Sequence, residues 1–376
     1  MTRRELLLSG VAAAVAGISA QEAMSATERQ SLRYGALALQ VLCDPVNQDN
    51  SLKDAHRRID ANIARVEGQL IAAVRYLKGF NGYDIKLAVL PEYWMTGFPY
   101  GETREEWQAK AAVPMQGRIP DMLAKMAQGA GVYLCSNQYE TDPNFPELYF
   151  QSNVIYAPNG NVVLRYRRMI SLYTPSPYDV WDAYLDAYGA EAVFPVASTE
   201  IGTLGTMASE EVLYPEIARA VSLKGAEVLL HPTSEVGAPG LTPKHIAKKA
   251  RAVENIAYVV SANSAKIIGT TIASASTDAM SILLDCNGRT LAEAGFGETF
   301  AANAVLDIGA LRETRRKPGM TNTISRLPSG AFAPEYAKAE YVTKNRMGNG
   351  KMMTHGEARA DQEAVIQRMV DSGVLK

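Results

Sequence analysis

The stretch Thr206-Met-Ala-Ser209-Glu-Glu-Val-Leu-Tyr-Pro215-Glu216-Ile-Ala-Arg219 is the part of the sequence around which the rest of the chain is organised. An apolar run over residues 201–207 leads into it, and apolar residues at helical spacing leave it over residues 217–223. Ser209 is therefore predicted to lie where a strand ends and a helix is about to begin. A side chain at such a turn stands at a sheet edge, near backbone N–H groups and a helix N-terminus, which favours a nucleophile.

The composition predicts a large soluble α/β core. The chain has 376 residues, of which 47% are hydrophobic and 21% charged, enough for one large domain or two small ones. The net charge of −2 gives no electrostatic footprint for nucleic acid. Three widely spaced cysteines and four scattered histidines predict neither a disulfide framework nor a metal site.

The N-terminus resembles an export signal. Arg3 and Arg4 precede an apolar, alanine-rich run that ends near Ala16, and small residues follow at 19–20. This pattern is typical of a twin-arginine signal, so residues 1–30 are predicted to be a signal and linker of a periplasmic or exported protein. The alternative is an amphipathic or disordered tail on a cytoplasmic protein. The apolar run is too short to span a membrane, and the mature form is expected to have no membrane partner.

Strands and amphipathic helices alternate in the first part of the chain. Residues 34–43 and 84–90 are predicted to be buried strands on either side of a long helix over residues 54–77. The second strand runs directly into Pro91 and Glu92. Because open α/β sheets place ligand groups at the carboxyl ends of their strands, Glu92 is a candidate site carboxylate. The alternative for an isolated acid at a strand end is simple solvation.

Two hairpins are predicted at Asn-Gly pairs, which are strong turn signals between strands. They span residues 150–166, with Asn159-Gly160 at the turn, and residues 280–292, with Asn287-Gly288 at the turn. Further strands are predicted over residues 131–139, 226–231, 258–263 and 302–306, and further helices over residues 104–112, 120–129 and 242–256. Two strand pairs separated by helices predict two facing sheets with helices outside.

This order of segments resembles the nitrilase (carbon–nitrogen hydrolase) superfamily. In that family a cysteine nucleophile lies six residues before a Pro-Glu pair, and Ser209 occupies this position before Pro215 and Glu216. Five segments match the family in the right order, from about residue 34 to residue 310. The resemblance implies a single-domain, four-layer α-β-β-α sandwich over residues 31–320.

The last part of the chain is predicted to be a C-terminal arm. Residues 321–376 are polar and rich in turn residues, with a final helix over residues 360–370, and are too sparse to form a core of their own. In the family such tails often lie across a partner subunit, so the resemblance implies a homodimer or a higher homo-oligomer. The alternative is a flexible tail.

The resemblance also assigns three catalytic positions. It makes Glu92 the general base and places Arg168 where the family has a catalytic lysine. Arginine stays charged and offers a planar fork, so Arg168 could hold an oxyanion but would be a poor proton shuttle. The alternative for Arg168 is an ion pair with a nearby acid. The hydroxyl of Ser209 is less acidic than a thiol and needs a strong adjacent base.

Candidate substrate contacts surround these three positions. They are Tyr93, Tyr173, Asp179, Glu210, Glu211, His231, Thr233 and Glu235. Asp179 falls nearest to the place of a second glutamate in the family, and Tyr173 belongs to an aromatic segment that is either a loop over the pocket or a packed edge. An acid at the position of Glu211 is usual in the family, whereas Glu210 is not. A lone histidine at a strand end, such as His231, is more often structural.

Two functions fit these residues. The first is a hydrolase that uses Ser209, Glu92 and Arg168 on a small amide-type, ester or lactone substrate, without a cofactor or metal. Nitrile hydrolysis is disfavoured because no thiol is present to form a thioimidate. The second is an inactive protein of the same fold that binds a small polar ligand or acts in assembly. Paired loss of the cysteine and the lysine fits both functions, and an engineered change at Ser209 alone would not account for Arg168.

Overall fold

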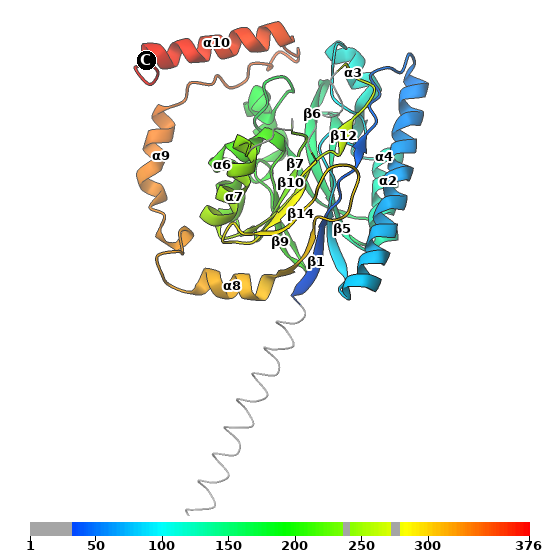
Figure 1. Ribbon diagram of the computed structural model, residues 1–376. Helices are drawn as coiled ribbons and strands as arrows, with labels where there is room; N and C mark the ends of the chain where they lie inside the picture. Colours follow the sequence, from blue (N-terminus) through cyan, green and yellow to red (C-terminus); the bar gives the residue numbers. More distant parts are fainter. Residues whose placement is uncertain (1–31, 236–240, 272–278) are drawn as a thin grey trace, which may run out of the picture.

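Two β-sheets pack face to face between outer helices in the computed structural model, which describes residues 32–235, 241–271 and 279–376 (Figure 1). The first sheet has the strand order β15-β1-β3-β5-β6-β7, with β4 paired to β5. Its strands are β1 (Arg33–Ala38), β3 (Ile85–Val89), β4 (Ala112–Pro114), β5 (Tyr133–Asp142), β6 (Phe145–Tyr156), β7 (Val162–Arg167) and β15 (Asn303–Asp307). This arrangement confirms the predicted four-layer α/β sandwich.

The second sheet has the strand order β14-β13-β11-β10-β9-β8. Its strands are β8 (Ala197–Thr199), β9 (Gly202–Thr206), β10 (Val228–Pro232), β11 (Tyr258–Ala262), β13 (Ile282–Leu284) and β14 (Thr290–Glu293). A small separate ladder joins β2 (Leu42–Cys43) to β12 (Lys266–Ile267). The predicted strand over residues 34–43 is therefore interrupted between β1 and β2.

Helices cover the outer face of each sheet. The helices are α2 (Leu52–Asn81), α3 (Arg104–Ala111), α4 (Arg118–Ala130), α5 (Trp181–Tyr188), α6 (Pro215–Leu223), α7 (Pro243–Asn255), α8 (Ile308–Arg316), α9 (Ser329–Lys338) and α10 (His355–Asp371). Figure 1 shows α2 and α4 on one side of the sheets and α6 and α7 on the other. None of the helices within the described ranges is long and apolar enough to cross a membrane.

Side-chain alternation along the strands builds two apolar layers. In β1, Ala36 and Ala38 contact the layer between the two sheets, whereas Leu37 contacts the layer beneath α2 and α4. In β3, Leu87 faces the first layer and Ala88 the second. Successive strand residues point to opposite faces, so each buried strand contributes to both layers. This explains why these strands are apolar at nearly every position.

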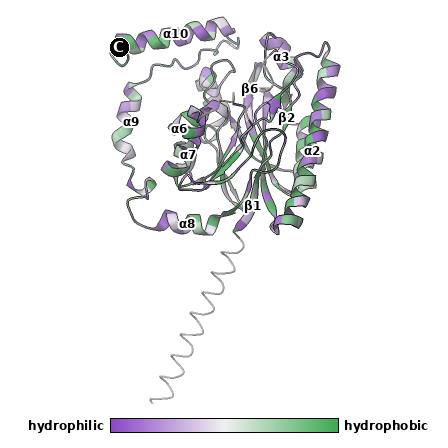
Figure 2. Cartoon of the chain, in the orientation of Figure 1, coloured by the Kyte–Doolittle hydropathy of each residue, from purple (hydrophilic) through white to green (hydrophobic). Residues whose placement is uncertain are grey.

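Local signals set the boundaries of the longest helix, α2. Ser51 caps its N-terminus by accepting a hydrogen bond from the Asp54 N–H at 3.1 Å, and Gly82 ends it in the left-handed region at φ 74°. Its buried residues recur every three or four positions, as predicted. Figure 2 shows that both hydrophobic and hydrophilic residues occur along the length of this helix.

Both predicted hairpins are present. β6 pairs with β7 and β13 pairs with β14, each pair antiparallel. The turn glycines Gly160 and Gly288 have φ values of 86° and 74°, in the left-handed region that glycine tolerates best. The Asn-Gly signal therefore placed both turns correctly.

The last part of the chain extends away from this core. Figure 1 shows α8, α9 and α10 following one another around one side of the molecule. Residues of α9 are not buried, and α10 buries only Ala358. Met347 and Met352, between the two helices, are buried against the core near α5. The predicted signal over residues 1–30 lies outside the described residues.

Candidate active site

Three strand ends bring Glu92, Arg168 and Ser209 into one buried region. Glu92 follows β3, Arg168 follows β7 directly, and Ser209 follows β9 and begins a short 3₁₀ turn, η3 (Ser209–Leu213). The exposed fractions of the three residues are 0%, 5% and 5%. The Glu92 N–H donates to the Thr233 carbonyl at 3.2 Å, so the ends of β3 and β10 meet here across the two sheets.

The carboxylate of Glu92 has one bound and one unbound oxygen. Its Oε1 accepts hydrogen bonds from Gln151 Nε2 at 2.9 Å and from Arg168 Nη1 at 3.1 Å. Its Oε2 is buried and has no partner among the described residues. A buried acceptor without a hydrogen-bond partner costs free energy. This oxygen can therefore accept a hydrogen bond or a proton from a group that is not yet bonded to it.

The guanidinium of Arg168 is held by two carboxylates. Nη1 bonds to Glu92 and, at 2.5 Å, to Gln151 Oε1, while Nη2 bonds to Glu210 and Nε donates to the Ile170 carbonyl at 2.8 Å. Burial opposes the charge, but Glu92 and Glu210 raise the pKa of Arg168 above its usual value. Arg168 is therefore a fixed cation and cannot exchange protons, which matches the ion-pair interpretation of the sequence.

The backbone of Ser209 is strained. Its φ of 48° lies in the left-handed region, which non-glycine residues rarely adopt. The Ser209 carbonyl accepts a hydrogen bond from His231 Nε2 at 2.8 Å. Tyr93, directly after Glu92, has a similar φ of 60°. Strained residues of this kind cluster at functional sites, because the surrounding structure must hold them in place.

Glu211 connects the turn at Ser209 to the loop after Arg168. Its Oε2 accepts from the Ala208 N–H at 2.7 Å. Its Oε1 accepts from the Met169 N–H at 2.7 Å, the Ile170 N–H at 3.1 Å and the Tyr166 hydroxyl at 2.7 Å. Burial raises the pKa of Glu211. Both carboxylate oxygens thus bond to groups of the protein. Glu211, which was predicted to contact substrate, instead stabilises the backbone around the site.

His231 also supports the turn. Because its Nε2 faces the Ser209 carbonyl, which can only accept, that nitrogen carries the proton and Nδ1 accepts from the Ser261 hydroxyl at 2.9 Å. Burial, together with the nearby Lys248, lowers the pKa of His231 to about 3. The imidazole is therefore neutral, and both ring nitrogens are occupied.

A lysine that the sequence analysis missed contacts the candidate nucleophile. Lys244, in the first turn of α7, donates a hydrogen bond from Nζ to Ser209 Oγ at 3.3 Å. One turn later, Lys248 forms a buried ion pair with Glu235 at 2.5 Å, and Thr233 donates to the same carboxylate at 3.4 Å. Burial opposes ionisation of Glu235, but Lys248 outweighs it and lowers the pKa of Glu235.

The sequence does contain a signal for the face of α7 that carries Lys244, namely the spacing of its basic residues. Lys244, Lys248 and Arg251 recur at intervals of four and three residues, which places them on one side. Arg251 donates to the carbonyls of Val212 and Leu213 at 2.8 and 3.2 Å. The basic face of α7 is therefore turned toward η3 and the strand ends.

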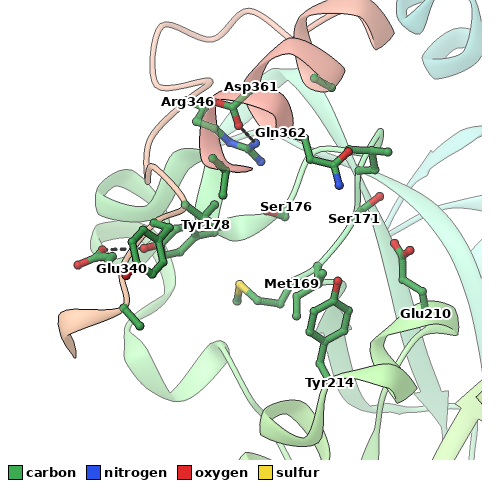
Figure 3. Close-up of a pocket in the computed structure, with 17 residues that line it drawn as sticks. Met169, Ser171, Ser176, Tyr178, Glu210, Tyr214, Glu340, Arg346, Asp361 and Gln362 are labelled. Atoms are coloured by element: carbon green, nitrogen blue, oxygen red, sulfur yellow. Dashed lines mark hydrogen bonds and ion pairs between the residues drawn. The ribbon is translucent and has the colours of Figure 1, made fainter. Parts of the chain in front are cut away.

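A cavity of about 530 Å³ lies between this region and the C-terminal arm (Figure 3). Met169, Glu210 and Tyr214 line it from the core, and Asp361 and Gln362 line it from α10. Figure 3 shows these two groups on opposite sides of the cavity. Glu210 both lines the cavity and binds Arg168, so it joins the cavity to the buried Glu92–Arg168 pair.

Two of the candidate substrate contacts interact with the arm. Asp179 is buried and accepts from the Ser176 N–H at 2.8 Å and from Arg346 Nε at 2.7 Å. The ring of Tyr173 lies 4.6 Å from that of His355, between centroids. Their interactions are therefore with the arm, whereas the remaining candidates lie around Glu92, Arg168 and Ser209.

Within the described residues, no cysteine thiol is activated as a nucleophile in place of Ser209. Cys43 and Cys135 are buried, and burial raises the pKa of both thiols to about 12. Burial also raises the pKa of Cys286, which is half-buried. Across the same described ranges, no three His, Cys, Asp or Glu side chains are grouped so that they could hold a metal ion.

The sequence of this chain is similar to those of known carbon–nitrogen hydrolases. Residues 55–316 match the family described as carbon-nitrogen hydrolase. The chain is 28% identical to a nitrilase of Pyrococcus abyssi, over 56% of this chain and 74% of that protein. It is 24% identical to the omega-amidase NIT3 of Saccharomyces cerevisiae, over 57% of this chain and 72% of that protein.

Solved structures show the same fold. The crystal structure of Saccharomyces cerevisiae Nit3 matches with a TM-score of 0.58 and 20% identity, over 77% of this chain and 95% of that chain. An amidase from Nesterenkonia sp. matches with a TM-score of 0.56 and 20% identity, over 81% of this chain and 95% of that chain. At these identities the likeness concerns the fold alone.

Proposed function

The chain belongs to the carbon–nitrogen hydrolase family, and we propose that it is an enzyme that hydrolyses a small amide-type substrate, or an ester or lactone, through an acyl intermediate on Ser209. The carboxylate of Glu92 carries the proposal. It is fully buried and fixed through Oε1, and its Oε2 has no partner among the described residues. A positioned carboxylate with an open acceptor is what a general base requires.

In the first half of the reaction, Glu92 Oε2 accepts the Ser209 proton while Oγ attacks the acyl carbon. The carbonyl oxygen then carries a negative charge. Arg168 uses four of the five N–H groups of its guanidinium for Glu92, Gln151, Glu210 and Ile170, which leaves one N–H for this oxyanion. Collapse of the tetrahedral intermediate breaks the carbon–nitrogen bond, and the departing nitrogen takes up a proton.

In the second half, water attacks the acyl-serine. The ester bond to Oγ breaks, Ser209 regains its proton, and the carboxylic acid leaves. The net reaction is the addition of one water to one amide, giving an acid and an amine or ammonia, and no redox change takes place. Stabilisation of the two oxyanions by fixed donors in a buried site supplies much of the rate enhancement in such reactions.

Amide-type substrates are favoured by two considerations. The relatives described above include proteins named omega-amidase and amidase. In addition, the described residues contain no activated thiol, so nitrile hydrolysis through a thioimidate is disfavoured. Tyr93, Glu210, His231, Thr233 and Glu235 lie near the proposed centre and are the candidates for substrate contact or support.

A second function is favoured by the bonding of Arg168. Its ion pairs with Glu92 and Glu210 would also stabilise a pocket that has lost catalysis. Such a protein would bind a small polar ligand or act in assembly. The strained turn at Ser209 favours the enzyme, since a non-catalytic site has no need to retain it.

Intact-mass measurement after incubation with activated esters, lactones and amides tests the enzyme proposal. We expect an acyl adduct on the wild type that is absent from the Ser209→Ala variant. No adduct and no turnover would contradict the proposal. Recovery of amidase activity in a Ser209→Cys, Arg168→Lys double variant would then identify a retained pocket without native catalysis.

We also propose that residues 1–30 direct export of the folded protein to the periplasm or beyond. The paired Arg3 and Arg4 before an apolar run support this proposal. Fractionation of cells that produce the wild type and an Arg3→Lys, Arg4→Lys variant tests it. We expect the wild type in the exported fraction and the variant in the cytoplasm, and equal distribution of the two would contradict the proposal.

A further inference from the structure

Lys244 contacts the candidate nucleophile but has no step in the reaction proposed above. Its Nζ lies 3.3 Å from Ser209 Oγ and donates a hydrogen bond to it. Lys244 is half-buried, and no carboxylate of the described residues lies within ion-pair distance of it. The ammonium therefore has Ser209 Oγ, and not a carboxylate, as its hydrogen-bond partner among the described residues.

The two other basic residues on the same face of α7 have structural partners. Lys248 is paired with Glu235, and Arg251 is bonded to backbone carbonyls of η3. These contacts fix the orientation of the helix against the strand ends. Lys244, one turn before Lys248, is thereby directed at Ser209, so its position is determined by the docking of the whole helix.

Helix stability does not account for a lysine at this position. The N-terminus of a helix carries a partial positive charge, which disfavours a cation in the first turn. Lys248, four residues later, adds repulsion between like charges. The first turn of α7 contains no acidic residue that would offset either effect. The contact with Ser209 is therefore the feature of the structure that gives Lys244 a role.

We propose that Lys244 donates the proton that the leaving nitrogen requires when the carbon–nitrogen bond breaks. In the tetrahedral intermediate, Oγ and the leaving nitrogen are bonded to the same carbon, so a donor in contact with Oγ lies next to that nitrogen. Arg168 cannot perform this step because it does not release its proton. This inference rests on the proposed acyl-serine reaction.

The protons balance over the cycle. During acylation, Glu92 takes the Ser209 proton and Lys244 gives one to the leaving nitrogen, so an amine departs and Lys244 is neutral. During deacylation, Lys244 takes a proton from the attacking water and Glu92 returns its proton to Oγ. Both residues then have their starting charges, and one water has been consumed.

Substrates that differ only in the leaving group distinguish this role from a structural one. An ester with a phenolate leaving group needs no proton for departure, whereas an amide does. We expect Lys244→Met to lower the acylation rate of Ser209 by the amide about 10²-fold or more and to leave acylation by the matched ester largely intact. Lys244→Arg, which keeps the charge without a transferable proton, should behave in the same way.

Lys249→Met is the matched control, because it removes a neighbouring lysine of α7 that makes no contact with Ser209. It should match the wild type with both substrates. Parallel loss of amide and ester acylation in Lys244→Met, or no loss with the amide, would overturn the inference. Absence of any acyl adduct on the wild type is a different result, since it would refute the acyl-serine reaction itself.

Discussion

The two oxygens of Glu92 are in different environments, and this difference has consequences at the scale of a single residue. Oε1 is fixed by Gln151 and Arg168, while Oε2 lacks a partner among the described residues. A glutamine at this position could keep its carbonyl oxygen at the Oε1 site and place its NH₂ group at the Oε2 site. The volume and the bonded side would be preserved, and only the basic oxygen would be lost.

Glu92→Gln is therefore expected to lower acylation of Ser209 by about 10² to 10⁴-fold, with a thermal unfolding temperature close to that of the wild type. Stopped incubation followed by intact-mass measurement gives the acylation rate. Glu216→Gln, a change of an exposed acid on α6, is the control and should react as the wild type does. Equal rates in the two variants would show that Glu92 is not the base.

His231 gives a prediction about stability and pH. Its native pKa is about 3, because of burial and Lys248, against about 6.5 for an unfolded histidine. Between these values the unfolded chain binds a proton that the native protein does not. The contribution of His231 is therefore fully present above pH 6.5 and is lost as the pH falls toward 3.

His231→Gln can still donate to the Ser209 carbonyl but does not titrate. We expect the wild type to lose stability relative to this variant by up to about 1.4 kcal/mol per pH unit below pH 6.5. Urea unfolding at pH 7, 6 and 5 measures the difference. Parallel pH dependence of the two proteins would mean that His231 is not buried in the neutral form.

The residue scale also shows what the sequence could reveal about the site. Their positions at the ends of apolar strands made Ser209 and Glu92 candidates, and the family resemblance suggested their roles. Lys244 was not found, since its contact with Ser209 depends on how α7 docks after a 35-residue separation in sequence. No local pattern encodes such a docking, although the basic face of α7 was visible.

At the scale of secondary-structure elements, Glu211 joins two segments that carry catalytic candidates. It satisfies backbone N–H groups on both sides, at Ala208 and at Met169 and Ile170. Removing this carboxylate would leave three N–H donors without partners, in a region with little access to water. The turn at Ser209 and the loop after Arg168 would then be free to separate.

Glu211→Ala is accordingly expected to destabilise the protein by at least about 2 kcal/mol, because buried donors would be left unpaired. Chemical denaturation measures this loss. Glu211→Gln keeps one acceptor oxygen and should lie between the alanine variant and the wild type. If Glu211→Ala were as stable as the wild type, the hydrogen bonds of Glu211 to the Ala208, Met169 and Ile170 N–H groups would not be formed in solution.

The elements were predicted unequally. The Asn-Gly hairpins and α2 followed directly from local signals, namely turn chemistry and helical spacing of apolar residues. Helix α5 was missed, because its aromatic residues are weak helix formers and suggested a loop. Tertiary contacts override that preference, since Tyr184 packs on Phe145 with ring centroids 6.4 Å apart and lies beneath the Arg167 guanidinium.

At the scale of the whole molecule, many of the contacts between the arm and the core gather at residues 178–182, where residues 344–347 of the arm bind. Arg346 binds Asp179, which is buried beside α5, and also Asp361 of α10. Met347 and Met352 supply the buried apolar contacts. The position of the arm could not be derived from the sequence, because its polar composition fits a free tail as well as a docked one.

Arg346→Met should weaken the attachment of the arm, since it leaves the buried Asp179 carboxylate without its cation, at a cost of about 3 kcal/mol. Limited proteolysis should then cut residues 341–371 faster than in the wild type. Lys344→Met removes a neighbouring, exposed ion pair with Asp182 and serves as the control. Equal cleavage of both variants would show that the Arg346–Asp179 pair does not hold the arm.

Exposed apolar side chains on the arm support the proposal of a homodimer or higher homo-oligomer. They include Phe332 and Tyr336 on α9 and Ile366 and Val370 on α10. Light scattering with size exclusion should give at least twice the chain mass of 40.7 kDa. Phe332→Glu with Ile366→Glu should lower that mass to one chain, and a monomeric wild type would contradict the proposal.

The cavity between the core and the arm has an implication for biosynthesis. The last core helix, α8, ends at Arg316, but Gln362 and Val365, near the end of the chain, complete the cavity wall. A ribosome has therefore made nearly the whole protein before this wall can exist. A nascent chain without the end of the arm therefore has the cavity open on one side, and premature termination within the arm would leave the cavity wall unfinished.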